Sequence, residues 1–341
     1  MADVWLDAVT PKDSLLIYSL LPALRKKGYK ILVTAKTQTQ TTEILDLLKV
    51  EYICVGEYGE TLKEKLTVEQ KRTLDFIDLF DRRGFPKVLW THGDVSAIRT
   101  AFGLKIPIVY ANDTLHALHV AKLVCPLVNW LVAPAAFGKS WSRFGISKSR
   151  IVLYNGVEEV AWLQEGRFEE PKFLRELANK KPVVLFRNVE YKASYCKEIK
   201  LDVWKLLKNL AEIATVVYLP RYKGEKEKLK ELSNVWTPPK TVLTAQLIPY
   251  VDMTVGSGGT ICRETALMGI PTINFHFWDA ISKYLHNNGL PIERLRDRRK
   301  IVHRTKEILR KKQNINRRMS SIEKIVNPIP LMVHYIEGFL D

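Results

Sequence analysis

Residues 253–271 read Met-Thr-Val-Gly-Ser-Gly-Gly-Thr-Ile-Cys-Arg-Glu-Thr-Ala-Leu-Met-Gly-Ile-Pro, and this stretch decides the fold. An apolar run ends in a glycine turn, which leads directly into a helix from about Ile261 to Met268. Gly269 and Pro271 end that helix, and a new apolar run begins at Thr272. A strand, a turn, a helix and a second strand in direct succession predict a parallel sheet covered by helices.

The glycine turn predicts a phosphate site. It consists of Gly256, Ser257, Gly258, Gly259 and Thr260. Its glycines allow positive φ and leave backbone N–H groups uncovered, its two hydroxyls add donors, and the following helix points its positive end at the same place. Glu264, one turn into the helix, can accept hydrogen bonds from a ribose. A turn that serves packing alone is the alternative.

The stretch lacks two well-known phosphate signatures. Neither the G-x-x-x-x-G-K-[ST] pattern of a P-loop nor the G-x-G-x-x-G pattern of a dinucleotide fold is present. We therefore expect neither ATP hydrolysis nor hydride transfer, but a diphosphate site of another kind.

Length and charge limit the class of protein. A chain of 341 residues with 46% hydrophobic content is long enough for two domains. Its formal net charge of +16 favours an anionic partner. Much of the basic charge lies in residues 294–318, which either contact an anionic membrane or another polyanion, or form an ordinary solvated helix face.

The remaining composition favours the cytoplasm. No apolar run reaches the roughly 18 residues that span a bilayer, so we expect no transmembrane segment. The four cysteines form no C-x-x-C pair, which argues against a zinc site and a disulfide framework. We expect a cytoplasmic protein, either free or peripheral to the membrane.

Strand-like and helical runs alternate along the whole chain, which predicts the α/β class. The polar segment 164–181 separates two such series, so we expect domains at 1–163 and 164–326, and a C-terminal helix within 327–341 that packs back across the domain junction. Because ligands gather at the carboxyl ends of parallel strands, we expect a cleft between the domains. In the first domain the expected strands are Val4–Val9, Lys30–Ala35, Glu51–Val55, Lys87–Thr91, Pro107–Ala111 and Trp130–Ala133.

Several polar residues of the first domain follow expected strands, where an acceptor would lie. Candidates for acid–base chemistry are His92, Asp94, Asp113 and His116, and Asp7, Thr10, Lys12 and Asn112 are expected to line the cleft.

Each of these candidates also has a plainer interpretation. Asp94 and Asp113 could cap the helices that follow them. Pro11 could start a helix that leaves Lys12 in solvent. His116 and His119 are one helical turn apart, but they have no acidic third ligand nearby, so we expect no metal.

Two blocks carry a family resemblance: Thr91 to Pro107, which contains His-Gly-Asp, and Gly256 to Pro271. They resemble the non-hydrolysing UDP-N-acetylglucosamine 2-epimerases and their glycosyltransferase-B relatives. The whole chain is similar to an uncharacterised prokaryotic, largely archaeal family of that superfamily. The resemblance implies two Rossmann-like domains that face a cleft, the GT-B architecture.

The resemblance also implies how a ligand is held. In these relatives the second domain holds a nucleotide diphosphate on the glycine turn, here Ser257, Gly258, Gly259 and Thr260, and a nearby acid, here Glu264, binds the ribose. Arg187, at the end of that domain's first strand, would meet a phosphate.

The epimerase acids are only partly present. Asp94 matches one of them, but Asn112 stands where the family carries Glu. Pro126–Asn129 replaces a Pro-Glu-Glu block, and Arg187–Glu190 replaces a His- and Arg-rich loop.

These features together predict an enzyme that binds a UDP-like nucleotide-sugar in the cleft and transfers the sugar to an unknown acceptor, without a cofactor or metal. The alternatives are a sugar-nucleotide 2-epimerase or hydrolase with altered acids, and a non-catalytic protein that binds polyanions or membrane surfaces on the same scaffold.

Overall fold

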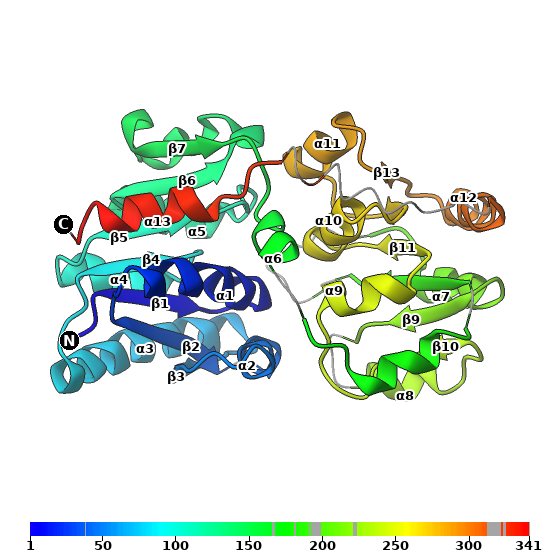
Figure 1. The fold of residues 1–341 in the computed structure, drawn as a ribbon, viewed down its shortest axis with the longest axis horizontal. Coiled ribbons are helices and arrows are strands. Elements are labelled where there is room, and N and C mark those ends of the chain that lie inside the picture. Colours follow the sequence, from blue (N-terminus) through cyan, green and yellow to red (C-terminus); the bar gives the residue numbers. More distant parts are fainter. Residues whose placement is uncertain are drawn as a thin grey trace. The chain divides into compact units, whose positions relative to one another are not determined.

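The chain forms two compact units (Figure 1), here in a computed structural model. Unit 1 comprises Met1–Glu165 and Val326–Asp341, and unit 2 comprises Gly166–Ile325. The described residues are 1–37, 39–165, 168–180, 182–189, 191, 199–220, 224–311, 322 and 325–340.

Unit 1 contains a seven-stranded parallel sheet in the order β3-β2-β1-β4-β5-β6-β7. Its strands are nearly continuous apolar runs because helices cover both faces. The strand order changes direction between β1 and β4, so the loops after these two strands diverge and leave room at the carboxyl edge. The strands are β1 (Val4–Ala8), β2 (Ile31–Thr37), β3 (Ile53–Glu57), β4 (Val88–Thr91), β5 (Ile108–Ala111), β6 (Trp130–Pro134) and β7 (Ile151–Tyr154).

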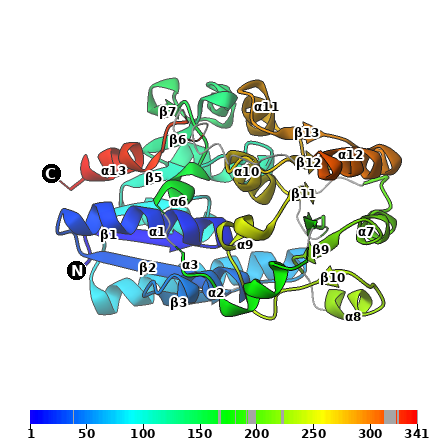
Figure 2. The ribbon, with the colours of Figure 1, turned by 45° about the vertical axis from the view of Figure 1, so that its right-hand side comes forward.

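The last helix of the chain belongs to unit 1. It contacts α1 and strands β4, β5 and β6, and Figures 1 and 2 show it in red alongside α1. The helices of unit 1 are α1 (Pro11–Lys26), α2 (Thr39–Leu47), α3 (Leu62–Arg83), α4 (Val95–Gly103), α5 (Leu118–Val124), α6 (Val160–Glu165) and α13 (Ile329–Glu337).

Unit 2 contains a six-stranded parallel sheet in the order β10-β9-β8-β11-β12-β13, which changes direction between β8 and β11. Its strands are β8 (Val183–Arg187), β9 (Thr215–Tyr218), β10 (Val235–Trp236), β11 (Met253–Gly256), β12 (Thr272–Asn274) and β13 (Ile292–Arg294). Its helices are α7 (Val203–Ala211), α8 (Glu225–Leu229), α9 (Thr244–Leu247), α10 (Gly259–Leu267), α11 (Ala280–Asn287) and α12 (Arg298–Arg310).

The expected α/β class with two parallel-sheet domains is confirmed. The six expected strands of the first domain are all present, with ends that differ by at most two residues. The edge strand β7 was not anticipated. It matters for the site, because the loop after β7 turns back toward α1, and α6 at the end of that loop contacts α1.

Candidate functional site

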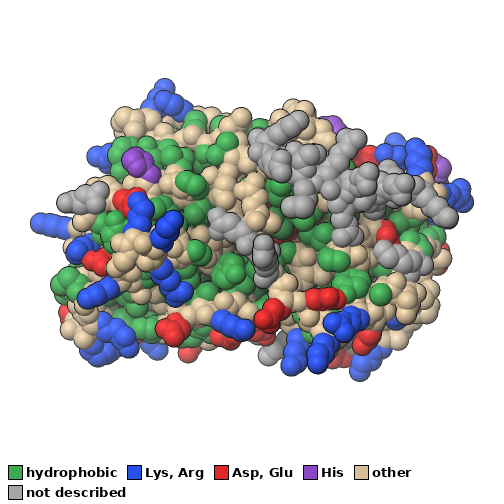
Figure 3. All heavy atoms as spheres, viewed as in Figure 1, with side chains coloured by type: hydrophobic (Ala, Val, Ile, Leu, Met, Phe, Trp, Pro, Cys, Tyr) green, Lys and Arg blue, Asp and Glu red, His purple; other side chains and the backbone are tan. Residues whose placement is uncertain are grey.

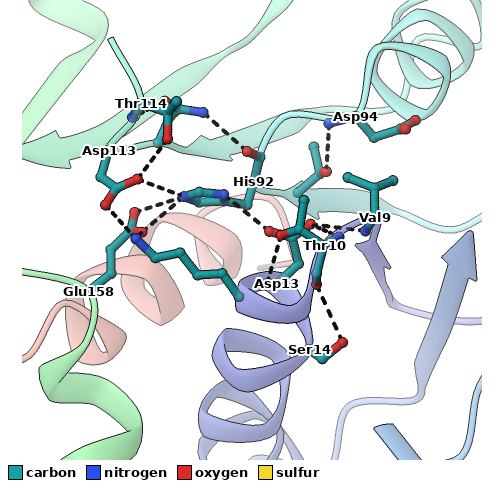
Figure 4. A network of polar contacts seen from close by, with 12 residues as sticks. Val9, Thr10, Asp13, Ser14, His92, Asp94, Asp113, Thr114 and Glu158 are labelled. Carbon is teal, nitrogen blue, oxygen red and sulfur yellow. Dashed lines mark hydrogen bonds and ion pairs between the residues drawn. The ribbon is translucent and has the colours of Figure 1, made fainter. Parts of the chain in front are cut away.

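A buried cluster of ionisable side chains lies at the carboxyl edge of the unit 1 sheet (Figure 4). The first turn of α1, the loops after β4 and β5, and the segment between β7 and α6 supply its members. We call it the His92 cluster, and it consists of Lys12, Asp13, His92, Asp113, Glu158 and Glu159.

The start of α1 fixes two members of the cluster. Thr10 caps the helix by accepting the Asp13 N–H, and Asp13 Oδ2 accepts the N–H groups of Val9 and Thr10 at 2.9 and 2.8 Å. Pro11 occupies the first helical position, as the plainer interpretation expected. The expectation that Lys12 lies in solvent is wrong, because its side chain is only 11% exposed and extends into the cluster.

His92 lies between carboxylates on both sides of its ring (Figure 4). Its Nδ1 is 3.1 Å from Asp13 Oδ1, and its Nε2 is 2.9 Å from Glu158 Oε2 and 3.8 Å from Asp113 Oδ1. Burial lowers the pKa of His92, but the Glu158 charge and the hydrogen bonds with Asp13 and Glu158 outweigh it and raise the pKa to about 10. At neutral pH the ring is therefore an imidazolium, which can donate a proton but cannot act as a base.

The Lys12 ammonium is the second cation of the cluster. It contacts Asp113 Oδ2 directly, and it lies 2.6 Å from Glu158 Oε2 and 3.5 Å from Glu159 Oε1. The cluster therefore gathers four carboxyl groups around two basic side chains in a buried site, an arrangement that is often associated with function.

Three members of the cluster also have the geometry of a metal site. Ligand atoms of His92, Asp113 and Glu158 all lie within 4.8 Å of one another. One imidazole and two carboxylates suit several divalent transition metals. Since Lys12 contacts both carboxylates, the chain supplies a cation of its own at this place.

The loop after β5 holds Asp113 in place. The Asn112 amide donates to the His92 carbonyl at 3.1 Å, and its oxygen accepts the Thr114 N–H at 2.6 Å. Asp113 accepts from the Thr114 hydroxyl at 2.9 Å. It does not cap α5, because that helix begins five residues later, at Leu118, and has no side-chain cap. His116 lies half-buried further along the same loop.

Asp7 and Asp94 belong to a different network, centred on Arg72 of α3. The Arg72 guanidinium contacts Asp7 Oδ1 and Asp94 Oδ1, each at 2.8 Å, and donates to the Val55 carbonyl at 2.7 Å. The expectation that Asp7 lines a cleft is wrong, because Asp7 is fully buried.

Asp94 has the capping role that its plainer interpretation predicted. It accepts the Ala97 N–H at the start of α4. Burial, opposed by Arg72, raises its pKa to about 6.

Asp13, Glu158 and Glu159 were missed by the sequence analysis. Asp13 is marked by the Thr-x-x-Asp spacing of a capping box. The pair Glu158-Glu159 stands in an otherwise apolar run from Val157 to Leu163, where two adjacent acids are unexpected unless they have buried partners.

The glycine turn of unit 2 lies at the carboxyl end of β11, where the strand order changes direction. Gly258 is the N-cap of α10 with φ −87°, and no side chain caps the helix. Positive φ is not used at Gly256, Gly258 or Gly259. Their role is close approach, since a Cβ on Gly256 would lie 2.9 Å from Cys262 Sγ, and one on Gly259 would lie 3.2 Å from the Arg263 guanidinium.

The other predicted nucleotide-binding residues surround this turn. Arg187 is paired with Gly256 in the sheet register and donates from Nη1 to the Leu219 carbonyl at 2.9 Å. The Ser257 hydroxyl donates to the Asn188 carbonyl at 2.7 Å and so connects the turn to the end of β8. The expected role of this hydroxyl as a donor to a ligand does not fit that contact, because its hydrogen is already used. Thr260 is half-buried in the first turn of α10, and Glu264 is buried one turn later.

The basic segment 294–318 is described only as far as residue 311. Basic side chains of α12 gather at the right of the view in Figure 3. A hollow of about 400 Å³ there is lined by both signs of charge, and Arg304 pairs with Glu293 at 2.8 Å. No helix in the described part of the chain is long and apolar enough to cross a membrane.

Comparisons with known proteins agree with this architecture. A family model described as "Protein of unknown function (DUF354)" matches residues 2–340. The uncharacterized protein MJ0665 of Methanocaldococcus jannaschii is 28% identical over 350 residues, which cover 99% of this chain and 98% of that protein.

Two solved structures show the same fold. The UDP-GlcNAc 2-epimerase of Methanocaldococcus jannaschii, in complex with UDP-GlcNAc and UDP, has a TM-score of 0.71 at 17% identity, with 97% of this chain and 99% of that one covered. The spinosyn forosaminyltransferase SpnP has a TM-score of 0.64 at 15% identity, with both chains fully covered. The GT-B and epimerase-like fold that the resemblance implied is confirmed.

Proposed function

This chain belongs to the DUF354 family, and we propose that it is an enzyme that binds a UDP-like nucleotide-sugar and transfers the sugar to an acceptor hydroxyl. The observation that carries the proposal is the helix α10, which begins without a side-chain cap at the point where the unit 2 sheet changes direction. The solved structures of this fold include an epimerase bound to UDP-GlcNAc and UDP, and a sugar transferase.

The diphosphate binds at the start of α10. The first turn of a helix has backbone N–H groups without intrahelical partners, and the helix dipole adds about half a positive charge there. A diphosphate satisfies both features. Arg187, next to Gly256 in the sheet, adds a full positive charge, and Glu264 accepts hydrogen bonds from the ribose.

The acid–base chemistry is assigned to Asp113 of the His92 cluster. The acceptor hydroxyl gives its proton to the Asp113 carboxylate while its oxygen forms a bond to the anomeric carbon. The bond from that carbon to the diphosphate oxygen breaks, and its electron pair leaves with UDP. His92 is protonated, and Asp7 and Asp94 are bound to Arg72, which leaves Asp113 and His116 among the sequence candidates of unit 1. We assign the role to Asp113 because it belongs to the His92 cluster.

Calorimetry tests the binding step, with UDP, UDP-sugars and uridine as ligands. We expect UDP to bind at least about tenfold more tightly than uridine, because the diphosphate gains charge-assisted hydrogen bonds. Failure of UDP and of every UDP-sugar to bind would overturn the proposal.

Release of UDP from a UDP-sugar tests the chemical step. We expect Asp113→Asn to retain UDP binding and to lose about 100-fold or more in the rate of release, since a general base typically contributes 10²–10⁴-fold. An unchanged rate would remove Asp113 from the mechanism. Analysis of the sugar product distinguishes transfer from 2-epimerisation and from hydrolysis.

A further inference from the structure

Two large apolar side chains are exposed at the ends of neighbouring helices of unit 1. Phe102 is the second-to-last residue of α4 and is 51% exposed, and Leu123 is the second-to-last residue of α5 and is 60% exposed. The two helices contact each other, and each connects neighbouring parallel strands, so both run back from the carboxyl edge of the sheet to the edge at which the strands begin. The Arg99 guanidinium reaches the same end of α4, since a Cβ on Gly103 would lie 2.8 Å from its Nη1. These side chains therefore lie at the edge opposite to the one that carries the His92 cluster.

Two short 3₁₀ helices extend this surface. The first, η1 (Cys125–Leu127), contacts both α4 and α5, and the second, η3 (Ser140–Phe144), contacts α5 and η1. A Cβ on Gly145, directly after η3, would lie 3.2 Å from Pro126 Cγ, so the two 3₁₀ helices are closely packed. We call the exposed side of these helices and of the turn after α4 the α4–α5 surface, and its side chains are Arg99, Phe102, Lys105, Lys122, Leu123 and Arg143.

The charged residues of this part of the chain are almost all basic. Residues 95–157 contain seven lysines and arginines and a single acid, Asp113, which is buried in the His92 cluster. All seven basic residues are exposed, and none of them forms an ion pair with another residue that the structure describes. Four of the seven belong to the α4–α5 surface, and the other three are Lys139, Lys148 and Arg150. The surface thus carries uncompensated positive charge around exposed apolar side chains.

Two other surfaces have only one of these features each. Leu62 and Leu66 of α3 are 80% and 66% exposed, but the same segment carries the exposed acids Glu60 and Glu64. Helix α12 of unit 2 carries many basic side chains, but no large apolar side chain is exposed on this helix. Among the described residues, the α4–α5 surface combines both features.

Exposed apolar side chains among basic ones match the layers of an anionic membrane. Apolar side chains enter the boundary between headgroups and acyl chains, while lysine and arginine keep their charged ends among the lipid phosphates. A nucleic acid supplies phosphates too, but it has no hydrocarbon layer to receive a leucine. The exposure of Leu123 beside Phe102 therefore favours a membrane over a nucleic acid.

We infer that the α4–α5 surface binds an anionic membrane, with Phe102 and Leu123 inserted at the level of the headgroups. The His92 cluster lies at the opposite edge of the unit 1 sheet, so lipid bound at this surface leaves the cluster uncovered. The inference goes beyond the proposed function and does not depend on it, because no residue of the surface belongs to the proposed nucleotide-sugar site.

Sedimentation of the full chain with lipid vesicles tests the inference. We expect binding to vesicles of equal parts phosphatidylcholine and phosphatidylglycerol, and much weaker binding to phosphatidylcholine alone, because the basic residues need an anionic surface. The double variant Phe102→Ser, Leu123→Ser should weaken binding to the anionic vesicles about tenfold or more, since two apolar side chains no longer leave water. Lys122→Gln should weaken it about fivefold, which is the effect of one basic residue near an anionic surface.

The matched controls change the same residue types on α3. The double variant Leu62→Ser, Leu66→Ser removes two exposed apolar side chains, and Lys63→Gln removes one exposed charge. Each control should change the vesicle affinity less than twofold, because α3 follows β3 and therefore begins at the carboxyl edge of the sheet, away from the α4–α5 surface.

Three outcomes would overturn the inference. The first is a wild-type protein that does not bind the anionic vesicles. The second is an equal loss of affinity in the variants and their controls, which would show that net charge alone attracts the protein to lipid. The third is binding to a DNA duplex without binding to vesicles, which would assign the basic residues to a nucleic acid. Should the Phe102→Ser, Leu123→Ser variant not fold, the comparison of Lys122→Gln with Lys63→Gln decides.

Discussion

Asp13 and His92 face each other across 3.1 Å, from Oδ1 to Nδ1, while the second oxygen of Asp13 caps helix α1. A helix cap is a local feature, but here it also orients a histidine 79 positions further along the chain. The start of α1 and the end of β4 are therefore coupled through one carboxylate. Changes at Asp13 should affect both the stability of the helix and the protonation of His92.

Replacement of Asp13 by Asn tests this coupling. Asn is an adequate partner for a helix start but carries no charge, so the pKa of His92 should fall while α1 persists. We expect a loss of about 1–3 kcal/mol in the free energy of unfolding, as for other buried polar networks that lose a partner. ¹⁵N NMR of the imidazole and chemical denaturation measure the two effects, and an unchanged His92 titration would contradict the coupling.

The stability of the protein should decrease in alkaline solution. The pKa of His92 is raised to about 10 in the folded state, above the value of 6.5 for an exposed histidine. The folded state therefore binds this proton more tightly than the unfolded state does. The stabilisation that results is fully present below pH 6.5 and is lost as the pH rises through 10. Denaturant titrations from pH 6 to 10.5 should show this loss as a decrease in the free energy of unfolding. The His92→Gln variant should lack the part of that decrease that comes from His92.

The carboxyl group of Asp94 should affect the stability of the protein at a lower pH than His92 does. Its pKa is raised from 3.8 to about 6, so the folded state holds this proton more tightly than the unfolded chain. Stability from this group is present below pH 3.8 and decreases as the pH rises through 6. The Asp94→Asn variant keeps a good helix cap for α4 and should flatten the profile between pH 4 and 6. A profile identical to that of the wild type would show that Asp94 is not the titrating group.

Removal of the Lys12 ammonium should create a metal site. The Lys12→Ala variant leaves His92, Asp113 and Glu158 with their ligand atoms within 4.8 Å of one another and without the competing cation. We expect Zn²⁺ to bind this variant at least about tenfold more tightly than the wild type, because imidazole and carboxylates are zinc ligands. Calorimetry measures the affinity.

Lys36→Ala is the matched control for that experiment. It removes a lysine that pairs with Glu69 at 2.6 Å, away from the three ligands. Equal zinc affinity in the wild type and in Lys12→Ala would show that the ammonium does not occupy the cation position.

The glycine turn should tolerate no side chain at Gly256. A methyl group there would lie 2.9 Å from Cys262 Sγ, so Gly256→Ala should cost about 1–3 kcal/mol of stability and weaken UDP binding. The double variant Gly256→Ala, Cys262→Ala removes the obstructing sulfur and should recover part of both losses. If the effects of the two substitutions on thermal stability simply add in the double variant, then close approach to Cys262 is not the reason why residue 256 is glycine.

Local patterns were sufficient for most of the architecture. The alternation of apolar and amphipathic runs predicted both parallel sheets, and the sequence around Gly256 predicted a strand, a turn and a helix that are all present. The conformation of that turn was not predictable, because whether a glycine provides positive φ or close approach depends on which atoms pack against it. Here the side chains of Cys262 and Arg263 leave too little room for a Cβ on Gly256 and Gly259, so the glycines serve close approach.

The amino-acid sequence by itself determined the α/β class, the positions of most strands and the uncapped start of α10, because these depend on neighbours within a few residues. Only the tertiary structure decided the membership of the His92 cluster. His92 and Glu158 are 66 positions apart, and they meet because the chain returns from the edge strand β7 toward α1. The same packing buries Lys12, and the separate packing of α3 against β3 brings Arg72 to Asp7. Charges withdrawn from water must find partners that no local pattern specifies.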